Sequence, residues 1–427
     1  EMWPGHGQIH IAFCTDLSLS LKMDVWETVY QYVYVKAIQD VQGVKCLILD
    51  DETSKIVSLV CSHTQILSSQ VYSVEKLDSM SKKRMGRVKA VLMIRPTSTN
   101  VRRLVQELKS PKYEEYHLFF TNTIPDHLLK ELAQADVSQV VAEVQEYYID
   151  FCPLAPTLFS LNEPCCAEIE PPCWNQALFD RIADGLISAL LALRRSPLIV
   201  FQRSSQLAGK LAFEIEERIA TGNRTSDIDL FQFGSAKQTA VSVLLIMDRR
   251  DDPLLPLLSQ WTYTSMVHEL LGIRDNRVDL SKVAGCDQEA AVLSVHDDDM
   301  YSRVEHMLFG ELGPTVSDAV AELQKSSGMS SGSRPQSLRD IQRLMNSFPE
   351  MRRQQGVVAK HVSITCELGR IVDSRLLMEL SELEQDIACS DGLEDPLQRV
   401  EEFLDHAQVA WEDKLRLALL YSMRFGA

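Results

Sequence analysis

Five short apolar runs separated by helical patterns occupy residues 44–144, and this alternation constrains the fold more than any other feature of the chain. The apolar runs predict strands at residues 44–49, 70–74, 88–94, 116–120 and 140–144. Helical periodicity predicts helices near residues 62–69, 99–108 and 125–135, and either Asn100 or Thr99 is expected to cap the second. Strands that are apolar almost throughout and alternate with helices are typical of a parallel sheet covered on both faces. We therefore expect a doubly wound α/β domain.

A second α/β segment and a helical part are expected further along the chain. A helix is predicted at residues 176–194 and a strand at residues 242–247, with a Pro/Cys-rich loop at residues 163–174 and a polar connection at residues 221–235. After Trp261 almost every pattern is helical. A Ser/Gly-rich linker at residues 326–337, between helical patterns at residues 301–324 and 338–348, predicts a helical hairpin with a flexible tip. Further amphipathic helices are predicted at residues 358–372, 376–389, 395–404 and 411–421.

Both ends of the chain carry unusual patterns. The first 22 residues lack a basic segment, and Asp16 interrupts their apolar stretch, so they do not resemble a signal peptide. Regular patterning starts after Met23, which we expect to be the true start, with residues 1–22 as a non-native or upstream extension. The last helical pattern has no cap, so we expect a truncated C-terminus.

Composition excludes some classes of protein. The formal net charge of −17 argues against nucleic acid as a partner, because phosphate binding needs a net basic face. No apolar run approaches the roughly 18 residues that a membrane span needs. Ten cysteines without a CxxC pair indicate a reducing compartment rather than a zinc site or a disulfide framework.

One local run of charge departs from this acidic balance. Residues 79–106 contain no acid and eight basic residues: Lys82, Lys83, Arg84, Arg87, Lys89, Arg95, Arg102 and Arg103. The commoner explanation for such a run is a solvated rim. The alternative is a docking face for an acidic partner.

Residues 243–271 join an apolar strand to a charged turn and then to a helix, in the sequence VLLIMDRRDDPLLPLLSQWTYTSMVHELL. Open α/β sheets place functional groups at strand ends. In one interpretation Asp248, Asp251 and Asp252 are general acids or metal ligands of an α/β hydrolase. No His, Cys or Lys constellation accompanies them at another predicted strand end. The preferred interpretation is therefore an Asp–Arg network that ties the strand to the helical part, helped by the rigid Pro253 turn.

Other motifs do not support catalysis. No GxxxxGK[ST] motif occurs, and no GxGxxG follows a predicted strand. A GxSxG match at residues 328–332 lies in the linker instead of on a strained strand–helix turn. His268 and Glu269 begin like a zinc-protease helix, but Gly272 stands where a second His is required. The carboxylates at positions 297–299 are expected at a solvated helix start, where they favour the helix dipole. No catalytic, cofactor or metal site is expected.

The junction segment also closely resembles the signature of the SM (Sec-one/Munc-eighteen) family of SNARE-binding trafficking proteins, in the run LLIMDRRDDPLLPLLSQWTYTSMVHELLGI. The segments KCLILDDETSKIVSLV, VLMIRPTSTNV and YHLFFTNTIPDHLLKELA agree with the same family, as does the predicted hairpin. NRVDLSKV and QEYYIDFCPLAPTLFSLN look most like its Golgi/endosome branch, and the alternative is another branch that serves the plasma membrane or the endoplasmic reticulum. The resemblance covers about residues 23–425 in consistent order. The Ser/Gly-rich tip and YSRVEHMLFGELG depart from the branch pattern.

The resemblance implies an α/β plus largely α protein without enzymatic activity, arranged as a three-domain arch. Residues 23–135 form the doubly wound, syntaxin-binding first domain. Residues 136–252 form a second α/β domain that is completed by a C-terminal tail absent from this sequence. Residues 253–427 form the mainly helical third domain, with a projecting hairpin at about residues 301–350. Asp248, Arg249, Asp252, Pro253 and Trp261 then belong to the structural junction between the second and third domains.

The resemblance also implies partners and contact surfaces. The partners are a syntaxin-type SNARE and the assembled SNARE bundle, bound by a cytoplasmic monomer that associates peripherally with Golgi, trans-Golgi-network and endosomal membranes. Asp50, Ser54 and Lys55 are expected to contact SNARE helices in the central cavity. The expected pocket for the N-terminal peptide of syntaxin consists of Phe119, Phe120, Ile124, Leu129 and Leu132. Phe119 and Phe120 should alternate faces of their strand, so at most one of them lines the pocket.

Overall fold

The computed structural model of the chain describes residues 9–14, 24–79, 84–163, 175–222, 231, 242–281, 283, 289–296, 298–326, 356–389 and 395–426. The chain divides into two compact units, Glu1–Asp251 (unit 1) and Asp252–Ala427 (unit 2), and each is described by itself. The second arm of the expected hairpin lies outside the described residues. So do nearly all of its linker and of the Pro/Cys-rich loop, and most of the polar connection.

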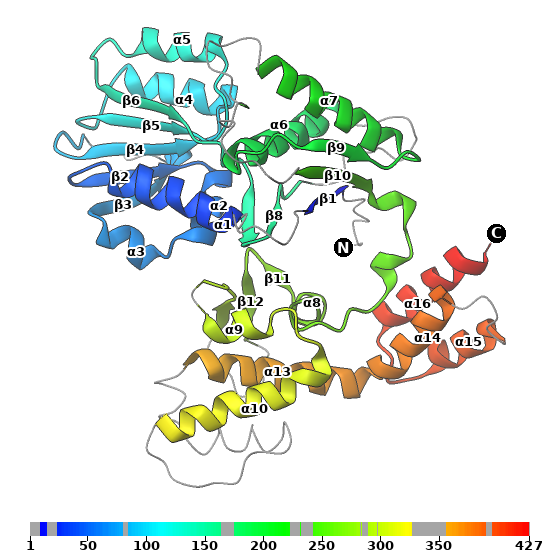
Figure 1. Cartoon of the computed structure of the whole chain (residues 1–427). Coiled ribbons are helices and arrows are strands. Elements are labelled where there is room, and N and C mark those ends of the chain that lie inside the picture. Colours follow the sequence, from blue (N-terminus) through cyan, green and yellow to red (C-terminus); the bar gives the residue numbers. More distant parts are fainter. Residues whose placement is uncertain are drawn as a thin grey trace. The chain divides into compact units, whose positions relative to one another are not determined.

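A five-stranded parallel sheet forms the first part of unit 1 (Figure 1). Its spatial order is β3-β2-β4-β5-β6, and every neighbouring pair is parallel. The strands are β2 (Lys45–Leu49), β3 (Val71–Lys76), β4 (Lys89–Ile94), β5 (Tyr116–Phe120) and β6 (Val141–Glu146). The five predicted strands and their parallel arrangement are therefore confirmed.

Helices cover both faces of this sheet, because its central strands bury apolar side chains on both sides. Helices α4 (Ser98–Leu108) and α5 (Asp126–Ala135) share one core with Phe120. The other core contains Phe119 and side chains of the remaining helical segments. These are α1 (Val25–Tyr30), η1 (Gln31–Gln39), α2 (Asp51–Val60) and α3 (His63–Ser68). A doubly wound sheet is therefore confirmed, and the two phenylalanines do alternate faces.

Two local features differ from expectation. The sequence patterns predict neither the α1–η1 segment nor α2, although Asp50 and Thr53 form a capping box at the start of α2 that marks a helix N-terminus. The expected cap of α4 at Asn100 or Thr99 is wrong. Thr97 is the last extended residue before that helix, and its hydroxyl oxygen accepts the Asn100 N–H at 3.2 Å.

The rest of unit 1 is a smaller α/β arrangement. Strand β10 (Val243–Asp248) pairs in parallel with β9 (Leu198–Phe201) and antiparallel with β1 (Ile9–Cys14). Helices α6 (Gln176–Ala192) and α7 (Gln206–Gly222) share a core with β10. The strands β7 (Cys152–Ala155) and β8 (Leu158–Ser160) form a hairpin, and the short turn η2 (Leu77–Ser79) follows β3. The predicted helix at residues 176–194 and the strand at residues 242–247 are confirmed.

Unit 2 is mainly helical around one core. After η4 (Leu255–Leu257), α8 (Tyr263–Met266) and η5 (Val267–Leu271), its helices are α9 (Asp299–Val304), α10 (Phe309–Ser326), α13 (Gly356–Arg375), α14 (Leu377–Cys389), α15 (Pro396–Asp405) and α16 (Trp411–Phe425). The last four predicted helices correspond to α13–α16 and are confirmed.

The expectation that almost everything after Trp261 is helical is wrong at one place. A small antiparallel sheet contains β11 (Ile273–Arg274), β12 (Arg277–Asp279) and β13 (Ala290–Val292). The turn between the first two strands is Asp275–Asn276, and both residues have positive φ, at 50° and 57°. Asp and Asn tolerate this conformation, which the tightest β-hairpin turns require.

Candidate functional site

Polar side chains gather at the carboxyl ends of β2 and β4, on either side of the point where the strand order of the sheet reverses. Open α/β sheets bind ligands at this position, which makes it a candidate ligand or catalytic site. Asp50 follows β2 and Arg95 follows β4. Asp50 is only 8% exposed, which places its carboxylate inside the fold.

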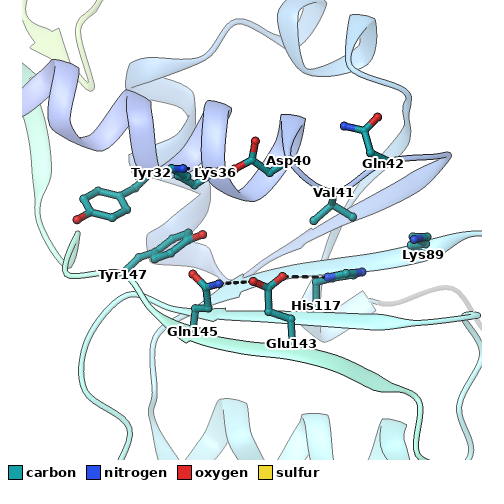
Figure 2. A pocket seen from close by; sticks show the side chains of 10 residues that line it. All are labelled: Tyr32, Lys36, Asp40, Val41, Gln42, Lys89, His117, Glu143, Gln145 and Tyr147. Atoms are coloured by element: carbon teal, nitrogen blue, oxygen red, sulfur yellow. Dashed lines mark hydrogen bonds and ion pairs between the residues drawn. The ribbon is translucent and has the colours of Figure 1, made fainter.

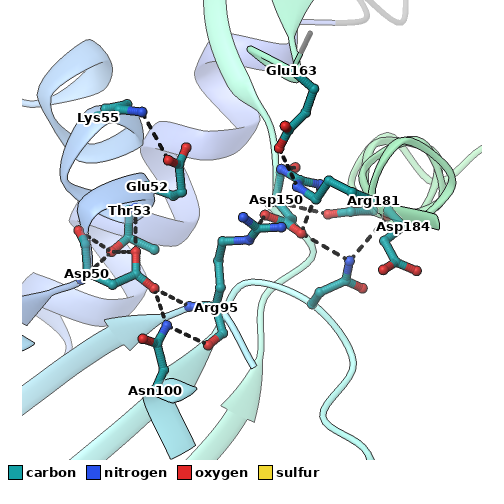
Figure 3. Close-up of polar contacts among 12 residues, drawn as sticks. Asp50, Glu52, Thr53, Lys55, Arg95, Asn100, Asp150, Glu163, Arg181 and Asp184 are labelled. Carbon is teal, nitrogen blue, oxygen red and sulfur yellow. Dashed lines mark hydrogen bonds and ion pairs between the residues drawn. The ribbon is translucent and has the colours of Figure 1, made fainter. Parts of the chain in front are cut away.

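The Asp50 carboxylate is fully engaged by neighbouring residues (Figure 3). Its Oδ1 accepts the Thr53 N–H at 2.8 Å and the Thr53 hydroxyl at 2.9 Å. Its Oδ2 accepts the backbone N–H of Arg95 and the side-chain amide of Asn100, both at 2.7 Å. These bonds cap α2 and tie the start of α4 to the sheet. Asp50 therefore acts within the fold, and the crevice at the switch point is filled by the protein's own side chains.

Ser54 and Lys55, the other two residues expected to contact SNARE helices, lie on α2 and are half-exposed. Lys55 forms an ion pair with Glu52 at 3.0 Å, and each of these side chains is 36% exposed. An exposed pair of this kind contributes little to stability and can rearrange at low cost. Of the three expected cavity residues, these two remain accessible to a partner.

A second polar cluster centres on Asp150, whose side chain is 4% exposed. Arg95 approaches one carboxylate oxygen at 3.1 Å, and Arg181 of α6 approaches the other at 3.2 Å. Arg181 also donates to the backbone carbonyl of Asp150 and pairs with Glu163 (Figure 3). The cluster joins the five-stranded sheet to α6. Sequence reasoning missed it, because its members are far apart in the sequence and no local pattern links them.

The five residues expected to form the peptide pocket are not all on the surface. Phe119, Phe120, Ile124 and Leu132 are buried, at 5% exposure or less, while Leu129 on α5 is 38% exposed. The expectation that these residues, with at most one of the two phenylalanines, line an exposed groove is therefore corrected, because only Leu129 is exposed. Four of them fill the two cores of the sheet, because β5 is a central strand with helices on both sides.

The α5 side of the sheet has a further exposed apolar side chain. Val144 on β6 is 42% exposed, and β6 is an outer strand of the five-stranded sheet. Its neighbours Glu143 and Gln145 line a hollow on the opposite, η1 side, so Val144 faces the side that carries α5. Glu146 also points to this side, since its carboxylate accepts the Ile124 N–H at 2.8 Å. Leu129 and Val144 are thus two exposed apolar side chains on the α5 side of the sheet, and Val137, just after α5, is 85% exposed as well.

A hollow of about 570 Å³ lies between η1 and the strands β5 and β6 (Figure 2). His117 contacts Glu143 at 3.2 Å, and Glu143 in turn accepts a hydrogen bond from Gln145. Lys36 pairs with Asp40, which lies on the η1 wall. The residues that line the hollow are Tyr32, Lys36, Asp40, Val41, Gln42, Lys89, His117, Glu143, Gln145 and Tyr147. These ten residues include no Ser, Thr or Cys nucleophile, and the charges among them occur beside opposite charges.

The charged turn after β10 holds a compact network. Asp248 is 6% exposed; its carboxylate accepts the Ser205 hydroxyl at 2.6 Å and pairs with Arg250 at 2.8 Å. Asp251 accepts hydrogen bonds from Gln202 and Ser204. The expected Asp–Arg network therefore exists, but its described partners lie at the end of β9 and the start of α7. It secures β10 within unit 1, and both carboxylates are committed to this role.

The remaining junction residues have separate surroundings. Arg249 is half-buried in η3 (Arg249–Asp251), while Asp252 and Pro253 are exposed. The Asp252 carboxylate accepts the Leu255 N–H at 3.3 Å. Trp261 donates its indole N–H to the Ser381 hydroxyl at 2.7 Å, within unit 2. Arg249 belongs to unit 1, while Asp252, Pro253 and Trp261 belong to unit 2.

Asp298 is not the solvated residue that the sequence suggested, because it is 2% exposed. It caps α9, and its Oδ2 accepts the His361 Nε2–H at 2.9 Å and pairs with Lys360 at 2.6 Å. The His361 Nδ1 accepts the Tyr263 hydroxyl at 2.7 Å. Burial would raise the pKa of Asp298, but the bonds from His361 and Lys360 outweigh it and lower the pKa to about 2. Asp299 is exposed, and Asp297 lies outside the described residues.

This network predicts an acid-sensitive unit 2. Burial lowers the pKa of His361 below its ordinary 6.5, and a neutral imidazole satisfies both of its partners. The unfolded chain then binds more protons than the folded one, so stability falls as the pH drops below about 6.5. The melting temperature of the wild type should fall as the pH drops below about 6.5, and that of the His361→Gln variant should not show this fall. The exposed His406→Gln variant should keep the wild-type slope, and an equal slope in all three proteins would contradict the assignment.

A third buried cluster lies where α16 meets α14. Arg416 pairs with Glu384 at 3.2 Å and with Asp413 at 3.3 Å, and it also pairs with Glu269. Burial raises the pKa of Glu384, and the Arg416 charge opposes that rise. Glu269 is therefore part of an ion-pair cluster, and the zinc-protease interpretation of residues 268–269 gains no support.

In the part of the chain that the structure describes, no group of three or more His, Cys, Asp or Glu side chains is placed to hold a metal ion. Among the same residues, no helix has the length and apolarity to cross a membrane. Cys46 and Cys61 are buried and Cys366 is half-buried, where burial raises its thiol pKa to about 11. A thiol of that kind is a poor nucleophile.

Comparisons with known proteins give a consistent result. The model of the Sec1 family matches residues 45–427. Vacuolar protein sorting-associated protein 45 of Dictyostelium discoideum is 40% identical over 406 residues, which cover 95% of this chain and 70% of that protein. The human protein of the same name is 39% identical over 407 residues, covering 94% of this chain and 69% of the relative.

Solved structures agree with these relatives. The SM protein Vps45 in complex with the Qa SNARE Tlg2 (1–310) is 36% identical, with a TM-score of 0.83, covering 95% of this chain and 72% of that one. The Unc18–syntaxin 1 complex from Monosiga brevicollis has a TM-score of 0.73 at 22% identity, which indicates a shared fold only. It covers 94% of this chain and 73% of that chain.

Proposed function

The chain belongs to the Sec1 family, and from this premise we propose that it binds a Qa, syntaxin-type SNARE and promotes SNARE complex assembly in Golgi, endosomal and vacuolar transport. The observation that carries the proposal is the likeness to Vps45, in sequence and in structure, whose solved complexes contain the Qa SNARE Tlg2. The related proteins are named for vacuolar protein sorting, which supplies the transport step.

This function requires no bond-making chemistry. Asp50, Asp150 and Asp248 carry the charge at the strand ends, and each is engaged by neighbouring residues of unit 1. A protein of this kind acts by holding SNARE helices in register. That lowers the entropy cost of bringing four helices together before their apolar layers pack.

Two surfaces of unit 1 are suited to SNARE contact. Ser54 and Lys55 on α2 are half-exposed and available for polar contacts with SNARE helices. Leu129 of α5 and Val144 of β6 supply exposed apolar area for a short peptide, since an apolar anchor with polar surroundings is how extended peptides are commonly recognised. We place the N-terminal peptide of the Qa SNARE on this second surface, defined by Leu129 and Val144.

The finer architecture belongs to the same proposal. Residues 23–135, 136–252 and 253–427 are the three domains, and a hairpin at about residues 301–350 extends the third. The protein is a monomer that associates peripherally with Golgi, trans-Golgi-network and endosomal membranes through its SNARE partner.

The double variant Leu129→Asp/Val144→Asp tests the peptide surface. Two carboxylates on this face would desolvate unfavourably against an apolar peptide anchor. We expect the affinity for the N-terminal peptide of the Qa SNARE to fall by about 30-fold or more, since interface anchors are commonly worth about 2 kcal/mol. Isothermal titration calorimetry with the synthetic peptide measures this change.

Leu67→Asp on α3 is the matched control, because Leu67 is 42% exposed on the helical layer of the opposite face. Its affinity should equal that of the wild type. If the double variant binds the peptide as tightly as the wild type, and circular dichroism shows that both proteins are folded, the peptide does not bind at this surface.

A further inference from the structure

The basic run at residues 79–106 continues with Lys109 and Lys112. Residues 79–112 contain ten Lys and Arg residues and one acid, Glu107, in a chain whose formal net charge is −17. The function proposed above uses none of these cations. Of the ten, Lys82 and Lys83 lie outside the described residues.

Four of the described cations are neutralised within the fold. Arg95 pairs with the buried Asp150, and it lies at the carboxyl end of the sheet, away from the others. Lys89 pairs with Glu115 at 2.8 Å. Arg103 pairs with Asp78, and Lys112 pairs with Glu107. The eight residues of the sequence run therefore do not form one face, and those that bind carboxylates already have a structural use.

The other four described cations are Arg84, Arg87, Arg102 and Lys109, which we call the basic face. All four are exposed. No carboxylate of the described residues forms an ion pair with any of them. The nearby acids Asp78, Glu107 and Glu115 already have cationic partners.

The fold places these four cations on neighbouring segments. Arg102 lies on α4 and Lys109 is its C-cap residue, seven positions later, so the two point the same way about 10 Å apart along the helix. Met85 bridges to Tyr113, and its N–H donates to the Lys112 carbonyl at 2.7 Å, which sets the loop carrying Arg84 and Arg87 beside the chain leaving α4. Figure 1 places α4 on the outer side of the sheet beside α5.

The chemistry of this face selects its partner. Between residues 84 and 112 no large apolar side chain is strongly exposed, so the face lacks the anchor that a specific protein segment uses. What it offers is charge density on long side chains. A layer of anionic lipid headgroups recognises that feature without a pocket, and charges farther than about 8 Å away are screened at physiological salt.

We propose that the basic face docks this protein directly on an anionic phospholipid bilayer, independently of any SNARE. Each cation near such a surface adds about five-fold to binding, and the contact weakens as salt rises. Direct docking orients α4 toward the membrane and keeps the protein close to membrane-anchored SNAREs, so it adds to SNARE binding without replacing it.

Flotation of the full chain with phosphatidylcholine vesicles, with and without phosphatidylserine, tests the proposal. The wild type should float only with vesicles that contain phosphatidylserine. The variant Arg84→Gln/Arg87→Gln/Arg102→Gln/Lys109→Gln should bind them about a hundred-fold or more weakly. The four side chains have no described ion partner, so the variant should fold, which circular dichroism checks.

Lys36→Gln/Lys130→Gln/Arg203→Gln/Arg277→Gln is the matched control, because it removes four other exposed cations and the same total charge. It should bind like the wild type. Equal loss in both variants, or no preference for phosphatidylserine, would overturn the proposal. Binding of polyglutamate that depends on the basic face, without vesicle binding, would overturn it in favour of an acidic protein segment. The vesicles carry no SNARE, so none of these outcomes bears on SNARE binding.

Discussion

Replacing Asp298 by Ala is expected to lower the free energy of unfolding of unit 2 by about 3–5 kcal/mol, the usual cost of breaking a buried ion pair from one side. The substitution leaves Lys360, at 12% side-chain exposure, and the fully buried His361 without their shared acceptor. It also removes the cap of α9. Urea unfolding followed by circular dichroism measures the change.

Asp299→Ala is the control, since Asp299 is the exposed neighbour in the first turn of the same helix. Its loss should stay within about 1 kcal/mol, the size of a favourable charge at a helix start. Equal effects from the two substitutions would mean that Asp298 contributes only through the helix dipole. That result would contradict a stabilising role for the buried network.

Asp150→Ala is expected to destabilise unit 1 by a similar amount, about 3–5 kcal/mol, because it leaves two guanidinium groups near one another without their carboxylate. The side chains of Arg95 and Arg181 are 18% and 12% exposed, so water replaces the lost partner only in part. Differential scanning calorimetry of the full chain measures the loss of thermal stability.

Asp180→Ala provides the comparison on the same helix, α6. Asp180 is 48% exposed and lies 3.9 Å from Arg218, so its removal should cost well under 1 kcal/mol. The Asp150 variant should still bind a SNARE peptide below its melting temperature, because the cluster has a structural role. Loss of binding in a folded Asp150 variant would instead place that cluster in the binding site.

The parallel sheet could be predicted because its strands are apolar on both faces. Residues 44–49 and 116–120 differ by at most one residue from β2 and β5, since a buried central strand leaves a continuous apolar run. Helix α2 escaped prediction because it follows β2 directly, although the Asp50–Thr53 capping box marks its start. The Asp275–Asn276 turn was a similar local signal for a β-hairpin in unit 2.

The polar clusters could not be predicted in the same way. Asp150 meets Arg95 and Arg181, and Asp298 meets His361, through packing of residues that are 31 to 63 positions apart in the sequence. No local pattern encodes such a meeting. The peptide surface also depended on burial that the sequence does not show. A pattern rich in apolar residues does not distinguish the exposed Leu129 from the buried Leu132. The basic run, by contrast, could be located from the sequence. The structure was needed to show which of its cations form no ion pair.

The central claim is that this chain is a SNARE-binding member of its family. Calorimetric titration of the full chain with the cytosolic region of a Golgi/endosomal Qa SNARE, and separately with that of a plasma-membrane Qa SNARE, tests it most directly. We expect one-to-one binding to the first that is about ten-fold or more tighter than binding to the second, a difference of about 1.4 kcal/mol. Tighter binding to the plasma-membrane SNARE would move the protein to another transport step, and no binding to either would contradict the account.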